Sequence, residues 1–258
     1  MCAPALYFRD ILPMTQLEFL GFRPGETPER EKRIAWREAV TAARLIVIGG
    51  GGLLNIDFFE PAFRHLAEIR RPDQKVVIWG AGHNSWQVSD WRHLKPRVDL
   101  HKDSYDLIGI RDDNQPFDWV PCVSCMDPIF DSPPSPTCDV ALYAHAGTIN
   151  NPKLRELLPR GLPTLDNNAA FKDAISFVMD CDLLLTDSYH GVYWATLLGR
   201  RVIAFPSSSK FYDLRFPVPL CDPSDWRRYA RLAVRYPDAL AECRAANRDF
   251  AARVADLL

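Results

Sequence analysis

The segment Asp187-Ser188-Tyr189-His190-Gly191 carries the side chains of this chain that are best suited to proton transfer. An unperturbed imidazole titrates near neutral pH, so His190 could act as a general acid or base, and a carboxylate such as Asp187 can orient it. The pattern Gly-x-Ser-x-Gly is absent, which makes Ser188 a poor candidate for a hydrolase nucleophile. A lone histidine is also common in purely structural settings, so both interpretations of His190 stay open here.

A run of four glycines, residues 49–52, is the second notable feature, because the chain holds only 13 glycines against 21 prolines. Backbone N–H groups without side chains can approach a phosphate or carboxylate, and a following helix N-terminus favours the same anion. The run predicts an anion-binding loop built on Gly50, Gly51 and Gly52. It matches neither the dinucleotide fingerprint nor the P-loop. A tight, closely packed turn between a strand and a helix is the alternative.

Continuous apolar runs indicate the elements that position these residues. A strand-length run without alternation is covered on both faces, which is typical of parallel sheets. We expect strands at residues 45–48, 76–79, 107–110, 139–144, 183–186 and 202–205, and helices at 27–43, 58–69, 171–179 and 192–198. The alternation of strands and helices predicts an α/β fold. Near the C-terminus an apolar stripe predicts a further helix after Pro237.

A proline-rich segment, Pro133-Pro134-Ser135-Pro136, interrupts this alternation and is the best linker in the chain. We therefore predict two Rossmann-like halves with parallel sheets. Residues 1–132 would form an N-terminal α/β domain with the glycine run. Residues 137–258 would form a C-terminal α/β domain with the His-Gly segment and the C-terminal helices.

The ends of the expected strands hold the candidate binding residues, because ligands of open α/β sheets lie beyond the carboxyl ends of the strands. Arg111 and Lys210 supply positive charge for an anion there, and arginine suits bidentate binding of phosphate or carboxylate. The full set of donor- or substrate-binding candidates is Gly50, Gly51, Gly52, Asn55, His83, Asn84, Arg111, Ser188, Tyr189, Gly191 and Lys210.

Composition excludes several classes of protein. Hydrophobic residues make up 47% of the chain, which is typical of a soluble globular protein and not of disorder or a fibre. With 31 Lys and Arg against 33 Asp and Glu, the net charge of −2 gives no global case for nucleic-acid binding. No apolar stretch approaches the roughly 18 residues of a membrane span. We expect a cytoplasmic protein without a secretory leader, which could also lie against the inner face of the membrane.

Seven scattered cysteines give no metal or disulfide framework. Cys122 and Cys125 form one Cys-x-x-Cys pair, but a structural zinc site would need a second pair of ligands. Asp180-Cys181-Asp182 matches the Asp-x-Asp pattern that can hold a metal with a sugar nucleotide, yet it lies at a helix end rather than after a strand. We therefore expect neither a metal nor another cofactor.

Three stretches together resemble the polysaccharide pyruvyltransferase family, and the resemblance extends over about residues 45–210. They are Ile48-Gly-Gly-Gly-Gly-Leu-Leu54, Gly109-Ile-Arg-Asp-Asp113, and the His-Gly segment with the helix and strand after it, residues 186–204. The resemblance implies a GT-B-like fold and the transfer of a pyruvyl ketal group from phosphoenolpyruvate to a glycan or lipid-linked glycan. It also implies that His190 is the catalytic or donor-binding histidine.

Two other functions fit the same residues. A GT-B glycosyltransferase that uses a sugar nucleotide would share the fold, and fold alone does not decide function. A non-catalytic glycan- or phosphate-binding protein would keep the same loops for recognition. The sequence carries no signal for the acceptor sugar or the oligomeric state.

Overall fold

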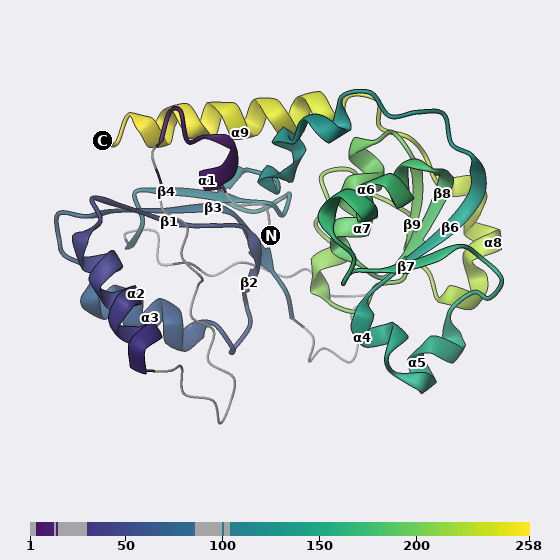
Figure 1. The fold of residues 1–258 in the computed structure, drawn as a ribbon, viewed down its shortest axis with the longest axis horizontal. Coiled ribbons are helices and arrows are strands. Elements are labelled where there is room, and N and C mark those ends of the chain that lie inside the picture. Colours follow the sequence, from purple (N-terminus) through teal and green to yellow (C-terminus); the bar gives the residue numbers. More distant parts are fainter. Residues whose placement is uncertain (1–3, 13, 15–29, 86–99, 101–103) are drawn as a thin grey trace. The chain divides into compact units, whose positions relative to one another are not determined.

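The computed structural model describes residues 4–12, 14, 30–85, 100 and 104–258. It divides the chain into two compact units, which Figure 1 shows as a ribbon. The first unit comprises Met1–Ser124 together with Arg244–Leu258, and the second comprises Cys125–Cys243. Each unit is built around a parallel sheet, so the predicted α/β class with two parallel sheets is confirmed.

The sheet of the first unit is centred on β3 (Lys75–His83). Within the described residues its other strands are β1 (Leu45–Ile48), β2 (Gly51–Leu54), β4 (Leu107–Ile110) and β5 (Asp118–Trp119). On one side β3 pairs with β1 along its first half and with β2 along its second half. On the other side it pairs with β4, which in turn pairs with β5. The carboxyl ends of β2, β3 and β4 therefore lie at the same edge of the sheet.

Both faces of this sheet are covered, as the continuous apolar runs predict. Helices α2 (Arg30–Ala42) and α3 (Glu60–Ile69) cover one face and supply Trp36 and Leu66 to its core. On the other face the Trp79 ring contacts Phe250 of α9 (Ala239–Ala255), and its Nε1–H donates to Asn247 Oδ1 over 2.9 Å. The short helix α1 (Pro4–Tyr7) is followed by Phe8, whose ring centroid lies 5.1 Å from that of Trp79.

The second unit has a parallel sheet in the order β7-β6-β8-β9. Its strands are β6 (Cys138–Ala144), β7 (Thr164–Asp166), β8 (Cys181–Thr186) and β9 (Arg201–Ala204). Its helices are α4 (Ala146–Ile149), α5 (Pro152–Leu157), α6 (Phe171–Met179), α7 (Tyr189–Leu197) and α8 (Trp226–Tyr229). Short 3-10 helices lie in its connections at Pro128–Phe130, Ser209–Phe211, Pro223–Asp225 and Ala230–Leu232, and a further one, Val123–Met126, spans the sequence boundary between the two units.

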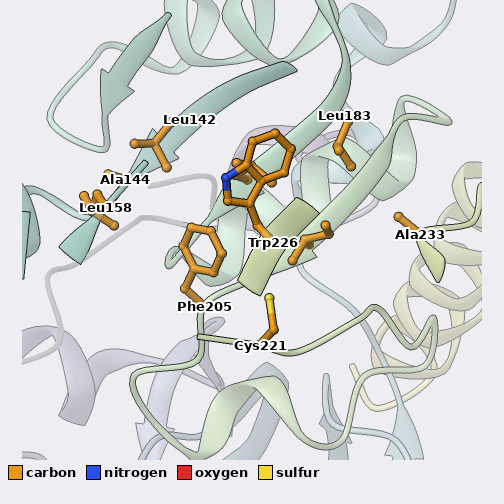
Figure 2. Packing of buried hydrophobic residues seen from close by; sticks show 10 residues of the cluster. Leu142, Ala144, Leu158, Leu183, Phe205, Cys221, Trp226 and Ala233 are labelled. Atoms are coloured by element: carbon orange, nitrogen blue, oxygen red, sulfur yellow. The ribbon is translucent and has the colours of Figure 1, made fainter. Parts of the chain in front are cut away.

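One core of the second unit gathers around Trp226 and Phe205, as Figure 2 shows. Their rings pack with Leu142 and Leu183 from the two central strands and with Cys221. Helices α6 and α7 pack on β8, and α7 also packs on β9. Every residue of α7 except His190 is buried, which explains why this helix is apolar around its whole circumference.

Two predictions about local structure are wrong. The glycine run does not form a loop throughout, because Gly51 and Gly52 belong to β2 and pair with Ala81 and Gly82 of β3. The helix expected from residue 192 begins three residues earlier, so His190 and Gly191 lie in the first turn of α7. The start expected at residue 27 for the helix that precedes β1 lies outside the described residues.

Candidate functional site

A buried polar cluster lies at the carboxyl edge of the first sheet. It consists of His83, the last residue of β3, with Arg111 and Asp112, which follow β4. Their exposed fractions are 0%, 5% and 3% respectively. The backbone N–H of His83 donates to Asp112 Oδ2 over 2.8 Å, and Asp112 Oδ1 lies 3.6 Å from His83 Nε2. A guanidinium, a carboxylate and an imidazole are thus held together where a parallel sheet binds its ligands.

Gly82 gives this cluster its room. A Cβ atom at residue 82 would lie 2.6 Å from Asp112 Oδ2 and closer still to Arg111 Nε. The side chains of Arg111 and Asp112 therefore cross the backbone at a position that only glycine leaves free. The Arg111 carbonyl in turn accepts a hydrogen bond from Trp119 Nε1–H over 3.1 Å, which ties the start of this segment to β5.

The predicted glycine loop lies beside this cluster, and its glycines allow neighbouring backbone segments to approach closely. A Cβ atom on Gly50 would lie 3.0 Å from the Gly80 carbonyl oxygen, and one on Gly52 would lie 2.8 Å from Asn84 Cβ. Asn84 N–H donates to the Leu54 carbonyl over 3.0 Å. Asn55 has a positive φ of 57°, which ends β2. The contacts support the close-packing alternative, and anion binding by these glycines stays a prediction.

A second set of polar residues lies at the carboxyl edge of the second sheet, around Asp187. Asp187 is 4% exposed and follows β8 directly. Its Oδ1 accepts the backbone N–H of His145 over 2.6 Å, and its Oδ2 accepts the hydroxyl hydrogen of Thr148. Asp187 thus joins the end of β8 to the segment that follows β6. The predicted orientation of His190 by Asp187 stays a prediction.

His190 lies in the first turn of α7 and is partly exposed. Its ring centroid lies 5.0 Å from that of Trp194 and 5.9 Å from that of Tyr189, which stand on either side of it in the helix sequence. Tyr189 also stacks on Tyr193 at 6.4 Å. The aromatic neighbours restrict the imidazole while leaving part of it exposed.

The turn that precedes His190 is braced by Thr186. The Thr186 hydroxyl donates to the Tyr143 carbonyl over 2.5 Å and accepts the N–H of Ser188 over 3.0 Å. A Cβ atom on Gly191 would lie 2.9 Å from Tyr143 Cδ1 and closer still to Thr186 Oγ1, so glycine is required for this approach. Burial, with a smaller effect of Asp166, raises the pKa of Tyr143 to about 12, so its phenol stays protonated at neutral pH.

Lys210 lies in the 3-10 helix Ser209–Phe211, a few residues beyond the end of β9. Its side chain is partly buried, and its Nζ lies 5.3 Å from the centroid of the Phe211 ring. Lys210 and His190 thus belong to the same unit, on segments that follow the neighbouring strands β9 and β8.

The structure collects the predicted residues into one set in each unit. His83, Asn84, Arg111, Asn55 and the glycines belong to the first unit, and Asp187, Ser188, Tyr189, His190, Gly191 and Lys210 belong to the second. Asp112, His145 and Thr148 lie in segments that the strand-end rule indicates, but nothing in the sequence selected them as site residues. The position of His145 directly after a strand was the available signal, but its link to Asp187 depends on a pairing that residue types do not reveal.

Among the described residues, no three or more His, Cys, Asp or Glu side chains gather closely enough to hold a metal ion. No helix in this part of the chain has the length and apolar character needed to cross a membrane.

Comparison with known protein families gives a match. The family model described as polysaccharide pyruvyl transferase matches residues 6–209. No curated protein and no solved structure matches the chain. The matched range includes the polar cluster of the first unit and the His-Gly segment of the second, and it ends at the residue before Lys210.

Proposed function

We propose that this chain, which belongs to the polysaccharide pyruvyl transferase family, transfers the pyruvyl unit of phosphoenolpyruvate to a glycan sugar. The product would be a cyclic ketal across two sugar hydroxyls, released together with inorganic phosphate. The observation that carries the proposal furthest is the placement of His190. It stands partly exposed at the carboxyl edge of a parallel sheet, on a turn that Thr186 and Gly191 hold in place.

Binding of phosphoenolpyruvate requires hydrogen-bond donors or positive charges, because this substrate carries a phosphate and a carboxylate. In the second unit, we assign an anionic group of the donor to the Lys210 ammonium. In the first unit, Arg111 is 5% exposed, and its side chain lies with that of Asp112 over Gly82. A guanidinium in such a setting binds an oxyanion more strongly than one in water. We assign Arg111 to an anionic group of a substrate.

The chemical step starts with a proton transfer from His190 to the methylene carbon of phosphoenolpyruvate, which makes the central carbon electrophilic. A sugar hydroxyl then forms a C–O bond to that carbon, and its proton returns to His190. The C–O bond to phosphate breaks, a second sugar hydroxyl adds to the same carbon, and the ring closes. The proton of the second hydroxyl leaves with the phosphate. Atoms and charge balance without an oxidant, a reductant or a metal.

Phosphate release tests this proposal. The purified chain is incubated with phosphoenolpyruvate and a panel of glycan and lipid-linked glycan acceptors, and phosphate and product mass are measured. We expect phosphate release that depends on an acceptor and a product heavier by pyruvate minus water. Release of nucleotide from sugar nucleotides with no turnover of phosphoenolpyruvate would overturn the proposal in favour of a glycosyltransferase. Thermal stabilisation by each donor, measured in parallel, reports binding without turnover.

A further inference from the structure

His145 is a second histidine at the edge of the sheet that carries His190. It is the first residue after β6, and β6 pairs with β8 in register, with Tyr143 opposite Thr186. Its backbone N–H donates to the buried Asp187 carboxylate over 2.6 Å. His145 is therefore fixed at the carboxyl edge of the second sheet, next to the turn that leads into α7. Its side chain is exposed.

The ring of His145 has one nitrogen occupied and one available. The backbone N–H of Gly147 donates to His145 Nδ1 over 3.0 Å. A Cβ atom at residue 147 would lie 3.1 Å from the same nitrogen, so the ring rests against the Gly147 backbone. Among the described residues, no hydrogen bond joins Nε2 to another group. Because Nδ1 accepts a hydrogen bond, it carries no proton of its own, and the neutral ring has its proton on Nε2.

This arrangement restricts what His145 can do. An imidazole with Nδ1 engaged as an acceptor and Nε2 already protonated cannot take a proton from a sugar hydroxyl at Nε2. If the neutral ring gave up its Nε2 proton it would become an imidazolate anion, which is too basic to form near neutral pH. The neutral ring is therefore not a general acid. The chemistry that remains is hydrogen-bond donation from an exposed, oriented N–H. Its natural partner is an anionic oxygen, since charged acceptors form the stronger hydrogen bonds.

We propose that His145 is a substrate-binding residue whose Nε2–H donates to an anionic oxygen of phosphoenolpyruvate. This inference rests on the proposed function for the identity of the donor. His145 and His190 then have different roles, since the first binds and the second moves protons. Because the bond forms in the ground state as well as in the transition state, its loss raises KM for phosphoenolpyruvate and leaves kcat nearly unchanged. A hydrogen bond to a charged group corresponds to roughly a 10- to 100-fold change in KM.

Two substitutions separate binding from a structural role at the start of α4. His145→Asn places an amide oxygen near the position of Nδ1, where it can accept the Gly147 N–H as a normal N-cap, but it has no donor at the position of Nε2. His145→Gln places an amide N–H near the position of Nε2 but loses the acceptor that holds Gly147. A purely capping role therefore predicts that Asn is silent and Gln is harmful. A binding role predicts the reverse for KM.

The experiment measures kcat and KM for phosphoenolpyruvate and for the acceptor in the full chain and both variants, with thermal midpoints alongside. We expect His145→Asn to keep its midpoint and raise KM for phosphoenolpyruvate roughly 10- to 100-fold, and His145→Gln to recover part of that loss. An unchanged KM in His145→Asn overturns the inference. So does a change confined to KM for the acceptor, or a loss of folding in His145→Asn.

Failure of the proposed function gives a different result. A wild-type chain that releases no phosphate from phosphoenolpyruvate overturns the proposed function without deciding the role of His145. Calorimetric titration with phosphoenolpyruvate and with inorganic phosphate then decides it, because binding needs no turnover. Weaker binding of these anions by His145→Asn supports the donor role, and equal or absent binding in both chains overturns it.

Discussion

The Asp187 carboxylate holds the first residue after a neighbouring strand, with Oδ1 2.6 Å from the backbone nitrogen of His145. Its other oxygen accepts the Thr148 hydroxyl hydrogen. Asp187 is only 4% exposed, and a buried carboxylate is costly unless its oxygens are hydrogen-bonded, as both are here. Asp187 therefore fixes the geometry of the edge that carries His145 and His190.

Removal of this carboxylate should loosen the edge. Asp187→Ala leaves the His145 N–H and the Thr148 hydroxyl without their acceptor, so we expect a loss of about 1–3 kcal/mol in the free energy of unfolding and a large loss of turnover. Asp187→Asn keeps one acceptor oxygen and should lose less stability. Urea unfolding and phosphate release check both variants. Equal stability of the alanine variant and the wild type would contradict the role given to Asp187.

Gly82→Ala tests the cluster in the first unit. Its methyl group would overlap with Asp112 Oδ2 at 2.6 Å and with Arg111 Nε, so both side chains must move. We expect at least a roughly 10-fold loss of kcat/KM and a destabilisation of about 1–3 kcal/mol. Gly49→Ala is the matched control, because its nearest contact would be Pro4 Cδ at 3.8 Å. Similar activity in the two variants would show that Arg111 and Asp112 are not needed in this position.

Gly191→Ala tests the contacts that Thr186 and Tyr143 make with the start of α7, next to His190. The added methyl group meets Thr186 Oγ1 and lies 2.9 Å from Tyr143 Cδ1, so we expect a loss of about 1–3 kcal/mol in stability and reduced turnover. Thr186→Ala removes the hydroxyl that the new methyl group would strike. The double variant should therefore lose less stability than the sum of the two single variants. If urea unfolding shows that the double variant loses as much stability as the two single variants together, the methyl group at residue 191 does not clash with the Thr186 hydroxyl.

The stability of the second unit should depend on pH through Asp182. Burial alone would raise the pKa of this carboxyl, but the hydrogen bond from Arg201, at 2.9 Å from Nε, and the charges of Arg201 and Arg235 lower it overall. A carboxyl group whose pKa is lower in the folded than in the unfolded protein stabilises the fold above about pH 4. This stabilisation disappears as the pH falls through the folded-state pKa.

Asp182→Asn gives the measurement for that pH dependence. We expect a loss of about 1 kcal/mol near pH 7 and a difference from the wild type that shrinks as the pH falls below about 4. The exposed Asp139 provides a control, Asp139→Asn, which should follow the wild type throughout. Urea unfolding across this pH range decides it, and a constant difference at every pH would contradict the ion-pair explanation.

Much of the fold could be predicted because the buried elements are continuous apolar runs. The strands β1 and β4 and the helix α6 begin and end where the sequence places them. The strand β2 could not be predicted, since Gly51 and Gly52 have no β propensity of their own and extend only because β3 offers them a partner. Tertiary pairing decided the structure there.

The candidate site shows the same limit. The strand-end rule found Arg111 and His190, because it needs only the order of elements. It could not find the Asp187–His145 bond or the Thr186 brace, which join residues 42 and 43 positions apart. Nor could it find that Asn247 of the C-terminal helix bonds Trp79 across 168 positions, although the apolar stripe predicted the helix itself.

The most direct test of the proposed chemistry is the rate of acceptor-dependent phosphate release from phosphoenolpyruvate by His190→Ala and the wild type. Proton transfer by a positioned side chain contributes roughly 100- to 10,000-fold to a rate, so kcat of the variant should fall by at least about 100-fold while the chain stays folded. A folded His190→Ala variant that releases phosphate at the wild-type rate would contradict the assignment of His190 as the group that moves protons.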